Sequence, residues 1–199
     1  MTALWYPDPP LRDDVVALRR WEDRDVRGVV EGMGGTDGDA RAWIERQAGR
    51  VETGEGLCLA ITDVGDDEAL GYVGLLFRPQ LESGIIGTHA PAEGLPAAEG
   101  LIFRRQPGNV GVGYWLLERA RHRGLATGAV ALLTRWALTE GAVARVEALV
   151  ETDNIPSQQV VERARFRREG HLRSYLTLNS RSADALIYSL LPEDLRADA

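Results

Sequence analysis

The clearest chemical pattern in this sequence is a turn at residues 121–127, which reads Arg-His-Arg-Gly-Leu-Ala-Thr. An apolar run precedes the turn and a helical pattern follows it, so unpaired backbone N–H groups and the positive end of a helix dipole should meet there. Gly124 lets the backbone approach a ligand closely, and Arg121 and Arg123 add positive charge. The turn therefore predicts a site for a pyrophosphate. The alternative is a plain strand-to-helix turn with surface arginines.

The composition excludes several other kinds of chemistry. All 23 cationic side chains of the 199 residues are arginines, so the chain cannot form a lysine Schiff base or use a P-loop lysine. The single Cys58 cannot make an intrachain disulfide, and His89, His122 and His171 lack the spacing of metal ligands. We therefore expect no metal site and a reducing, cytoplasmic location.

The net charge of −7 argues against a general nucleic-acid or anionic-membrane binder, because such proteins present a broad cationic surface. No apolar stretch approaches the ~20 residues of a membrane helix, so we expect no membrane partner. The charge is uneven, however, because residues 104–173 hold 12 of the 23 arginines and 7 of the 30 acids. The part of the chain that carries the turn is therefore locally basic.

The elements around the turn follow from the hydrophobic pattern. Residues 109–117 form an apolar strand pattern, and a helical pattern runs from the turn to Glu140-Gly141. A second apolar strand pattern follows at 143–150. Strand, turn, helix and strand make a βαβ unit, so these two strands should be parallel. A dinucleotide-binding turn is excluded, because no third glycine follows Gly111 and Gly113.

The rest of the chain supplies further strands and helices to the same sheet. We expect a strand at 15–21, helices at 23–33 and 40–50, a hairpin of strands 57–62 and 70–77, a helix at 157–165 and a final hairpin of strands 166–178 and 184–191. Residues 79–108 break the pattern with repeated glycine and proline, and we interpret them as an insertion. The whole chain, 1–199, is expected to form a single domain with helices on both faces of a mixed sheet.

Several short motifs follow one another along this framework. They are Gly113-Tyr114-Trp115-Leu116-Leu117, the turn at 121–127, Asn154-Ile155-Pro156-Ser157, Phe166-Arg167-Arg168-Glu169-Gly170 and the stretch from Asp184 to Leu191. In this order they resemble the GCN5-related N-acetyltransferases (GNAT), and the RimJ/RimL-like branch of ribosomal-protein alanine acetyltransferases in particular. The resemblance covers about residues 15–191 apart from the insertion. It implies an α/β fold of three layers, α/β/α, with a mixed, mostly antiparallel sheet and a splayed parallel central pair.

The resemblance also implies direct transfer of an acetyl group from acetyl-CoA, as cosubstrate, to a primary amine of a protein N-terminus or a small molecule. It assigns the coenzyme pyrophosphate to Arg121, His122, Arg123, Gly124, Leu125, Ala126 and Thr127. The pantetheine arm is expected between the two parallel strands, against the backbone of Trp115, Leu116 and Leu117. Asn154 and Ser157 match the family's Asn-x-x-Ser, which approaches the pantetheine and the thioester sulfur.

The resemblance points to one candidate acid. Ser157 is the candidate acid or sulfur-side donor, because the position four residues later, where the family carries a tyrosine, is Val161. The alternative for Ser157 is a helix N-terminal serine that satisfies the backbone. A backbone N–H near Leu116 is expected to stabilise the oxyanion that forms when an amine attacks the thioester.

No base is assigned from the sequence. Gly111 stands where many relatives carry a glutamate, residues 173–176 offer no carboxylate, and Glu93 and Glu99 lie in the insertion. A second hypothesis is therefore a GNAT-shaped module that binds acyl-CoA or regulates without turnover. The identity of the amine, the size of the acyl group and the formation of a homodimer stay open at this point.

Overall fold

The computed structural model describes residues 4–77, 108–178 and 181–196, so the expected insertion lies outside the described residues up to position 107. The elements follow the expected order. They are β1 (Val16–Arg19), η1 (Asp23–Asp25), α1 (Val26–Met33), α2 (Asp37–Thr53), β2 (Gly56–Asp63), β3 (Asp66–Leu76), β4 (Asn109–Leu116), η2 (Glu118–Ala120), α3 (Leu125–Thr139), β5 (Arg145–Glu151), α4 (Ile155–Arg163), β6 (Arg167–Leu178) and β7 (Arg181–Leu190).

The seven strands form one mixed sheet in the order β1-β2-β3-β4-β5-β7-β6. Every neighbouring pair is antiparallel except β4 and β5, which are parallel as the βαβ pattern predicts. These two strands pair only over residues 109–111 and 145–147. Beyond that point β4 continues along β3 and β5 continues along β7, so the parallel pair splays into a fork.

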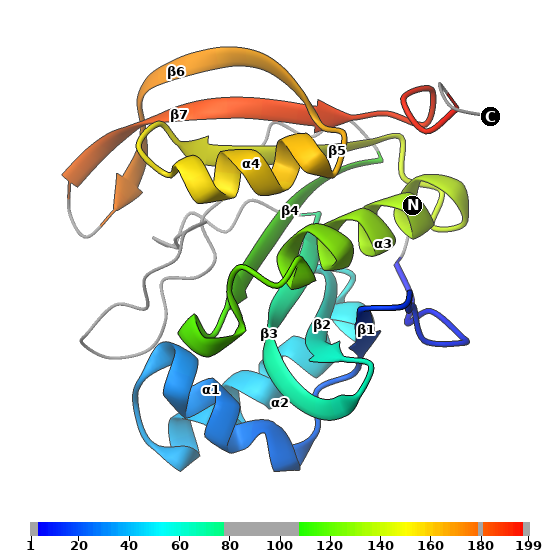
Figure 1. Ribbon diagram of the computed structural model, residues 1–199, viewed down its shortest axis with the longest axis vertical. Coiled ribbons are helices and arrows are strands. Elements are labelled where there is room, and N and C mark those ends of the chain that lie inside the picture. Colours follow the sequence, from blue (N-terminus) through cyan, green and yellow to red (C-terminus); the bar gives the residue numbers. More distant parts are fainter. Residues whose placement is uncertain (1–3, 78–107, 179–180, 197–199) are drawn as a thin grey trace.

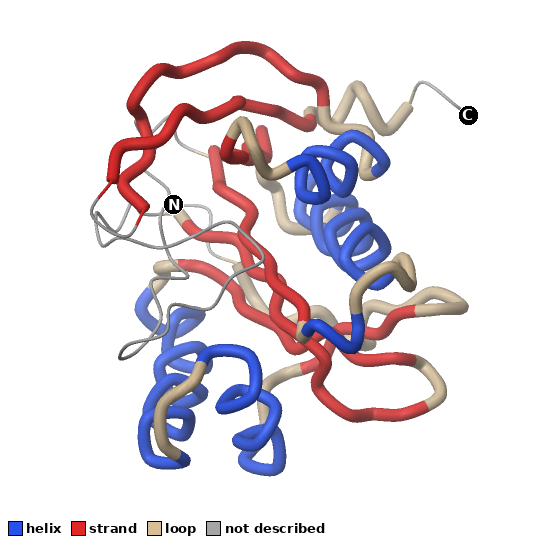
Figure 2. Tube along the Cα trace, turned by 60° about the vertical axis from the view of Figure 1, so that its left-hand side comes forward, coloured by secondary structure: helices blue, strands red, loops and turns tan. Residues whose placement is uncertain are grey.

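Helices cover both faces of the sheet, as the resemblance implies. Helices α3 and α4 pack over one face, and α1 and α2 pack over the other, where Figure 1 shows them at the bottom of the molecule. Figure 2 shows the two groups of helices on opposite sides of the strands. The three-layer α/β/α fold is confirmed.

Strand β2 illustrates why the middle of the sheet reads as a continuous apolar run. Leu57, Leu59 and Ile61 pack into the core under α3, while Cys58 and Ala60 pack into the core under α1 and α2. Because successive side chains point to opposite faces, both sets must be apolar when both faces are covered.

The expected bounds of the first two helices were wrong at their ends. Residues 23–33 divide into a 3₁₀ turn and α1, and the second helix spans 37–53 rather than 40–50. A capping box between Thr36 and Asp39 begins α2, and Gly54, at φ 68°, ends it in the left-handed conformation. Helix ends follow from caps of this kind, which lie outside the apolar repeat. Within the described ranges, no helix combines the length and the hydropathy needed to cross a bilayer.

Candidate functional site

The turn after β4 leads into a helix N-terminus that no side chain of the described residues caps. His122 and Gly124 both have left-handed backbone conformations, at φ 61° and 81°, and α3 begins directly afterwards. The first helical hydrogen bond runs from the N–H of Gly128 to the carbonyl of Gly124, so the N–H groups of residues 125–127 precede the helical ladder. Thr36 and Asn154, in contrast, cap α2 and α4 with their side chains. The α3 N-terminus can therefore accept an anion.

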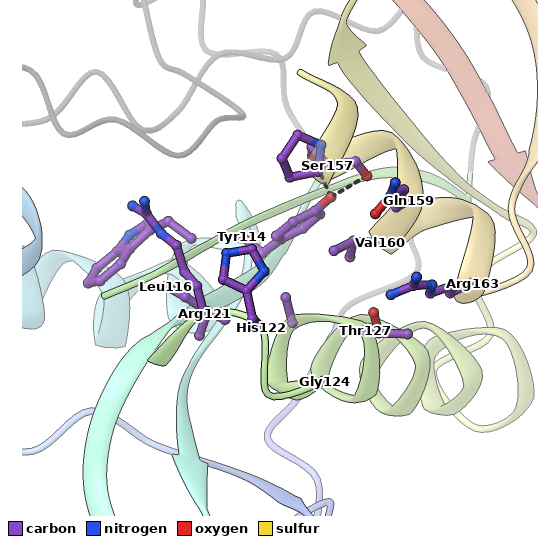
Figure 3. A pocket seen from close by; sticks show the side chains of 13 residues that line it. Tyr114, Leu116, Arg121, His122, Gly124, Thr127, Ser157, Gln159, Val160 and Arg163 are labelled. Atoms are coloured by element: carbon purple, nitrogen blue, oxygen red, sulfur yellow. Dashed lines mark hydrogen bonds between the residues drawn. The ribbon is translucent and has the colours of Figure 1, made fainter. Parts of the chain in front are cut away.

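A pocket of about 420 Å³ opens beside this turn, between β4, α3 and α4. In Figure 3, the α4 residues Gln159, Val160 and Arg163 lie across the pocket from Gly124, which precedes α3, and from Thr127 in its first turn. The lining residues are Tyr114, Trp115, Leu116, Arg121, His122, Gly124, Ala126, Thr127, Pro156, Ser157, Gln159, Val160 and Arg163. Eight of the twelve residues expected from the sequence to bind a coenzyme lie around this one pocket.

Four expected residues lie elsewhere, each for a clear reason. The side chains of Leu117 and Leu125 are buried in the hydrophobic core. Arg123 forms an ion pair with Asp63 at the end of β2 and is not among the lining residues of the pocket. Asn154 caps α4 by accepting a hydrogen bond from the N–H of Ser157 at 3.1 Å.

The cap formed by Asn154 leaves the Ser157 hydroxyl available for other contacts. Serine at a helix N-terminus commonly satisfies a backbone N–H, but here Asn154 does so. The Oγ atom of Ser157 lies 2.6 Å from the hydroxyl oxygen of Tyr114, and the two groups are joined by a dashed line in Figure 3. Tyr114 also donates to the carbonyl of Ser157 at 3.1 Å. This contact between β4 and α4 was not predicted from the sequence.

Burial determines the state of the Tyr114 hydroxyl. The side chain is buried between β4 and α4, and this burial raises the pKa of the phenol above its ordinary value. The hydroxyl therefore keeps its proton at neutral pH. The period-two alternation of β4 was the available signal, because it puts Tyr114 on the face covered by α3 and α4 and Trp115 on the face covered by α1 and α2. The Trp115 ring in fact lies against Gly32 of α1.

The carboxylates that the sequence analysis looked for are placed differently. Residues 173–175 lie in an irregular part of β6, where Ser174 has φ 50°. Its N–H donates to Asp184 of β7 and lowers the pKa of that carboxyl, which also contacts His171 at 2.8 Å. Glu93 and Glu99 lie outside the described residues. Among the residues described, no group of three or more potential ligands is arranged to hold a metal ion.

Comparisons with known proteins agree with this geometry. The model of the acetyltransferase (GNAT) domain matches residues 8–167. A curated relative, the uncharacterized N-acetyltransferase p20 of Bacillus licheniformis, is 32% identical over 93 residues, which are 47% of this chain and 52% of the relative. The chain thus spans about half the length of this relative.

Solved structures share the fold at lower sequence identity. A probable acetyltransferase superposes with a TM-score of 0.71 at 19% identity, over 94% of this chain and 99% of the other. RimL, described as a ribosomal L7/L12 α-N-protein acetyltransferase in complex with coenzyme A, gives a TM-score of 0.69 at 15% identity, over 93% and 99% of the two chains. Likeness at this level of identity concerns the fold.

Proposed function

The chain belongs to the acetyltransferase (GNAT) domain family, and on that basis we propose that it transfers an acetyl group from acetyl-CoA to a primary amine. The observation that carries the proposal is the α3 N-terminus, which lacks a side-chain cap from the described residues and lies at the pocket beside the fork. The acceptor is a protein N-terminal α-amine or the amine of a small molecule. The RimL neighbour, described as an α-N-protein acetyltransferase, supports the protein amine.

The turn fits the pyrophosphate of the coenzyme. The N–H groups of residues 125–127 and the positive end of the α3 dipole favour an anion, and the left-handed residues His122 and Gly124 shape the backbone around it. Arg121 lines the same pocket and adds positive charge. On the opposite wall, Arg163 is suited to a further phosphate group, such as the adenosine 3′-phosphate.

The free edge of β4 fits the pantetheine arm and the thioester. Beyond Gly111, β4 has no ladder with β5, so backbone groups on that edge are available to a ligand. The N–H of Leu117 donates to Leu70 of β3 at 2.9 Å. Because backbone N–H groups alternate between the two edges of a strand, the N–H of Leu116 is directed to the fork. This supports Leu116 as the donor that stabilises the oxyanion.

The hydroxyl pair fits the step in which the thiol leaves. When a neutral amine attacks the thioester carbon, a C–N bond forms, the C–S bond breaks and the departing thiolate takes up a proton. Ser157 lines the pocket on α4, and its hydroxyl contacts the protonated phenol of Tyr114. We assign Ser157 as the sulfur-side donor and Tyr114 as the group that orients and reprotonates it.

Product analysis tests this function against the non-catalytic alternative. Acetyl-CoA is incubated with a panel of peptides with free N-termini and of small primary amines, and mass spectrometry detects acetylated products. We expect acetylation of at least one class of amine. An acyl-CoA-binding module would bind coenzyme A and acetylate none of them.

A further inference from the structure

Glu147 is a buried carboxylate on the face of the sheet opposite the pocket. Its neighbours in β5, Val146 and Ala148, pack into the core under α3 and α4, so the alternation of side chains directs Glu147 to the other face. The residue is only 9% exposed. Glutamate is rarely buried to this extent unless it is paired. The position of Glu147 in the sheet therefore calls for an explanation.

The register of the strands puts Glu147 at the vertex of the fork. Its Cα partner on β4 is Gly111, and this is the last parallel pair before the two strands separate. Paired residues on neighbouring strands project to the same face, and Gly111 has no side chain there. The Glu147 carboxylate therefore lies next to the backbone of β4. A larger residue at position 111 would restrict the carboxylate, and Gly111 does not.

A guanidinium holds the carboxylate in place from its own strand. The Nε atom of Arg145 donates to Oε1 of Glu147 at 2.6 Å, and the same guanidinium also binds Glu169 of β6. Ser189 of β7 donates to Glu169 at 2.6 Å. Two carboxylates share one guanidinium, so the group carries a net charge of −1. Glu169 is exposed, whereas Glu147 is buried, so the charge of the group is most effective at Glu147.

The two carboxylates are not equivalent. Hydrogen bonds from Arg145 hold the pKa of Glu169 below its ordinary value. Both oxygens of Glu169 receive a donor, whereas Oε2 of Glu147 receives no hydrogen bond from the residues that the structure describes. Glu169 therefore acts as the fixed anion, and Glu147 has an oxygen available for a substrate.

Two further ion pairs lie on the strands around Glu147 in the part of the chain that the structure describes. Arg167 is paired with Asp194 at 2.7 Å, and Glu151, four residues further along β5, is paired with Arg181. Two positions beyond Gly111, a side chain at Gly113 would meet, among the described residues, only the edge of the Tyr72 ring, at 3.9 Å. The described residues therefore leave space at Gly113 on this face of β4, on the same side as the Glu147 carboxylate.

The chemistry of the proposed reaction requires a proton acceptor at such a place. An α-amine has an ordinary pKa of about 7.7–8.0 and a lysine-type amine one of about 10.4, so both are largely protonated at neutral pH. An ammonium cannot attack a thioester, because its nitrogen has no lone pair. Building on the proposed function, we propose that Glu147 binds the ammonium group of the acceptor on this face of the fork and accepts its proton.

The proton balance of this step is complete. The ammonium gives one proton to Glu147 and becomes a neutral amine, which forms the C–N bond while the C–S bond breaks. The thiolate takes one proton from the Ser157 and Tyr114 hydroxyls, and the second proton of the nitrogen, lost through solvent as the amide forms, replaces it there. Glu147 then releases its proton to water, so the overall reaction yields amide, thiol and one free proton.

The test compares Glu147→Gln with Glu151→Gln in the full chain. Glu151 lies on the same strand and the same face and is also ion-paired, so it is a matched control. Initial rates of thiol release are measured from pH 6 to pH 9.5 with the best amine found for the wild type. Melting temperatures with and without coenzyme A are recorded for every variant, and Glu147→Asp keeps a carboxylate if the glutamine variant does not fold.

We expect Glu147→Gln to lower kcat/KM for the amine about 100-fold or more at pH 7, with the coenzyme A-dependent melting shift unchanged. The loss should shrink above the pKa of the amine, where the neutral form is already abundant. Glu147→Asp should keep more activity than Glu147→Gln at pH 7, and Glu151→Gln should stay near wild type. An equal loss at every pH, or an equal loss in Glu151→Gln, would overturn the assignment. Absence of turnover in the wild type would instead overturn the proposed function itself.

Discussion

The hydroxyl oxygen of Tyr114 on β4 lies 2.6 Å from the Oγ atom of Ser157 on α4. This contact joins the central strand of the fork to the first turn of the helix across from it. It depends on Asn154, whose side chain satisfies the N–H of Ser157 and leaves the serine hydroxyl to the tyrosine. The wall of the pocket therefore carries two linked hydroxyls, both able to donate at neutral pH.

Removing the tyrosine hydroxyl should slow turnover without weakening coenzyme binding. Tyr114→Phe keeps the ring and loses one hydrogen bond, so we expect kcat to fall about tenfold while the KM for acetyl-CoA changes little. Ser157→Ala should lower kcat by about 100-fold, since it removes the proposed donor itself. Steady-state kinetics of the two variants and the double variant check the coupling. Strictly additive effects would show that the hydroxyls act independently.

The buried phenol also makes stability depend on pH in the alkaline range. Below about pH 10, the ordinary pKa of tyrosine, Tyr114 is protonated in both the folded and the unfolded chain and contributes no slope. Above that pH the unfolded phenol ionises while burial keeps the folded one neutral, so the free energy of unfolding should fall by about 1.4 kcal/mol per pH unit. Denaturant titrations at pH 9 to 11 measure this slope. The slope of the free energy of unfolding against pH should be smaller for Tyr114→Phe than for the wild type by that amount. Equal slopes would contradict the assignment of this effect to the buried Tyr114 phenol.

A negative charge at the α3 N-terminus should abolish coenzyme binding. Coenzyme A at 100 times its Kd should stabilise the wild type by about 2.7 kcal/mol. Gly124→Glu introduces an anion and strains a residue at φ 81°, so we expect no melting shift with coenzyme A. Gly54→Glu is the matched control, because Gly54 is also left-handed, at φ 68°, and has open space around its side-chain position. A coenzyme-dependent shift in Gly124→Glu equal to that of Gly54→Glu would exclude the turn as the pyrophosphate site.

Arg163 should distinguish coenzyme A from its form without the 3′-phosphate. The side chain lines the pocket from α4, and a hydrogen bond between charged groups contributes about 1.5–3 kcal/mol. Arg163→Ala should therefore weaken coenzyme A binding about tenfold or more and leave dephospho-coenzyme A binding unchanged. Isothermal titration calorimetry measures both affinities. Arg167→Ala, which alters an arginine outside the pocket lining, should bind both ligands like the wild type.

The sequence was sufficient for the fold because its apolar patterns are long and its motifs occur in a fixed order. The βαβ unit around residues 121–127 predicted the parallel pair, and the alternation in β2 follows from two covered faces. Helix ends were less predictable, since caps such as Thr36 and Gly54 lie outside the periodic positions. These caps satisfy backbone groups, and that requirement leaves only a short signal in the sequence.

The parts of the site that are formed by local backbone geometry could be predicted from the sequence. The contacts between side chains of distant segments were harder to predict. The uncapped α3 N-terminus follows from a local turn, but the contact between Tyr114 and Ser157 joins residues 43 positions apart. Arg123 illustrates the same limit, because an arginine in a predicted phosphate turn pairs instead with Asp63 across 60 positions. Glu147 could be related to Gly111 only through the parallel register of their strands.

The most direct test of the account is the rate of thiol release from acetyl-CoA with and without an amine acceptor, measured for wild type and for Gly124→Glu. We predict release in the wild type that depends on the amine and saturates with acetyl-CoA, and none above background in Gly124→Glu. The contrary result would be a wild type whose melting temperature rises with coenzyme A but whose thiol release is increased by no amine. That result would contradict the proposed function and identify a coenzyme-binding module without transferase activity.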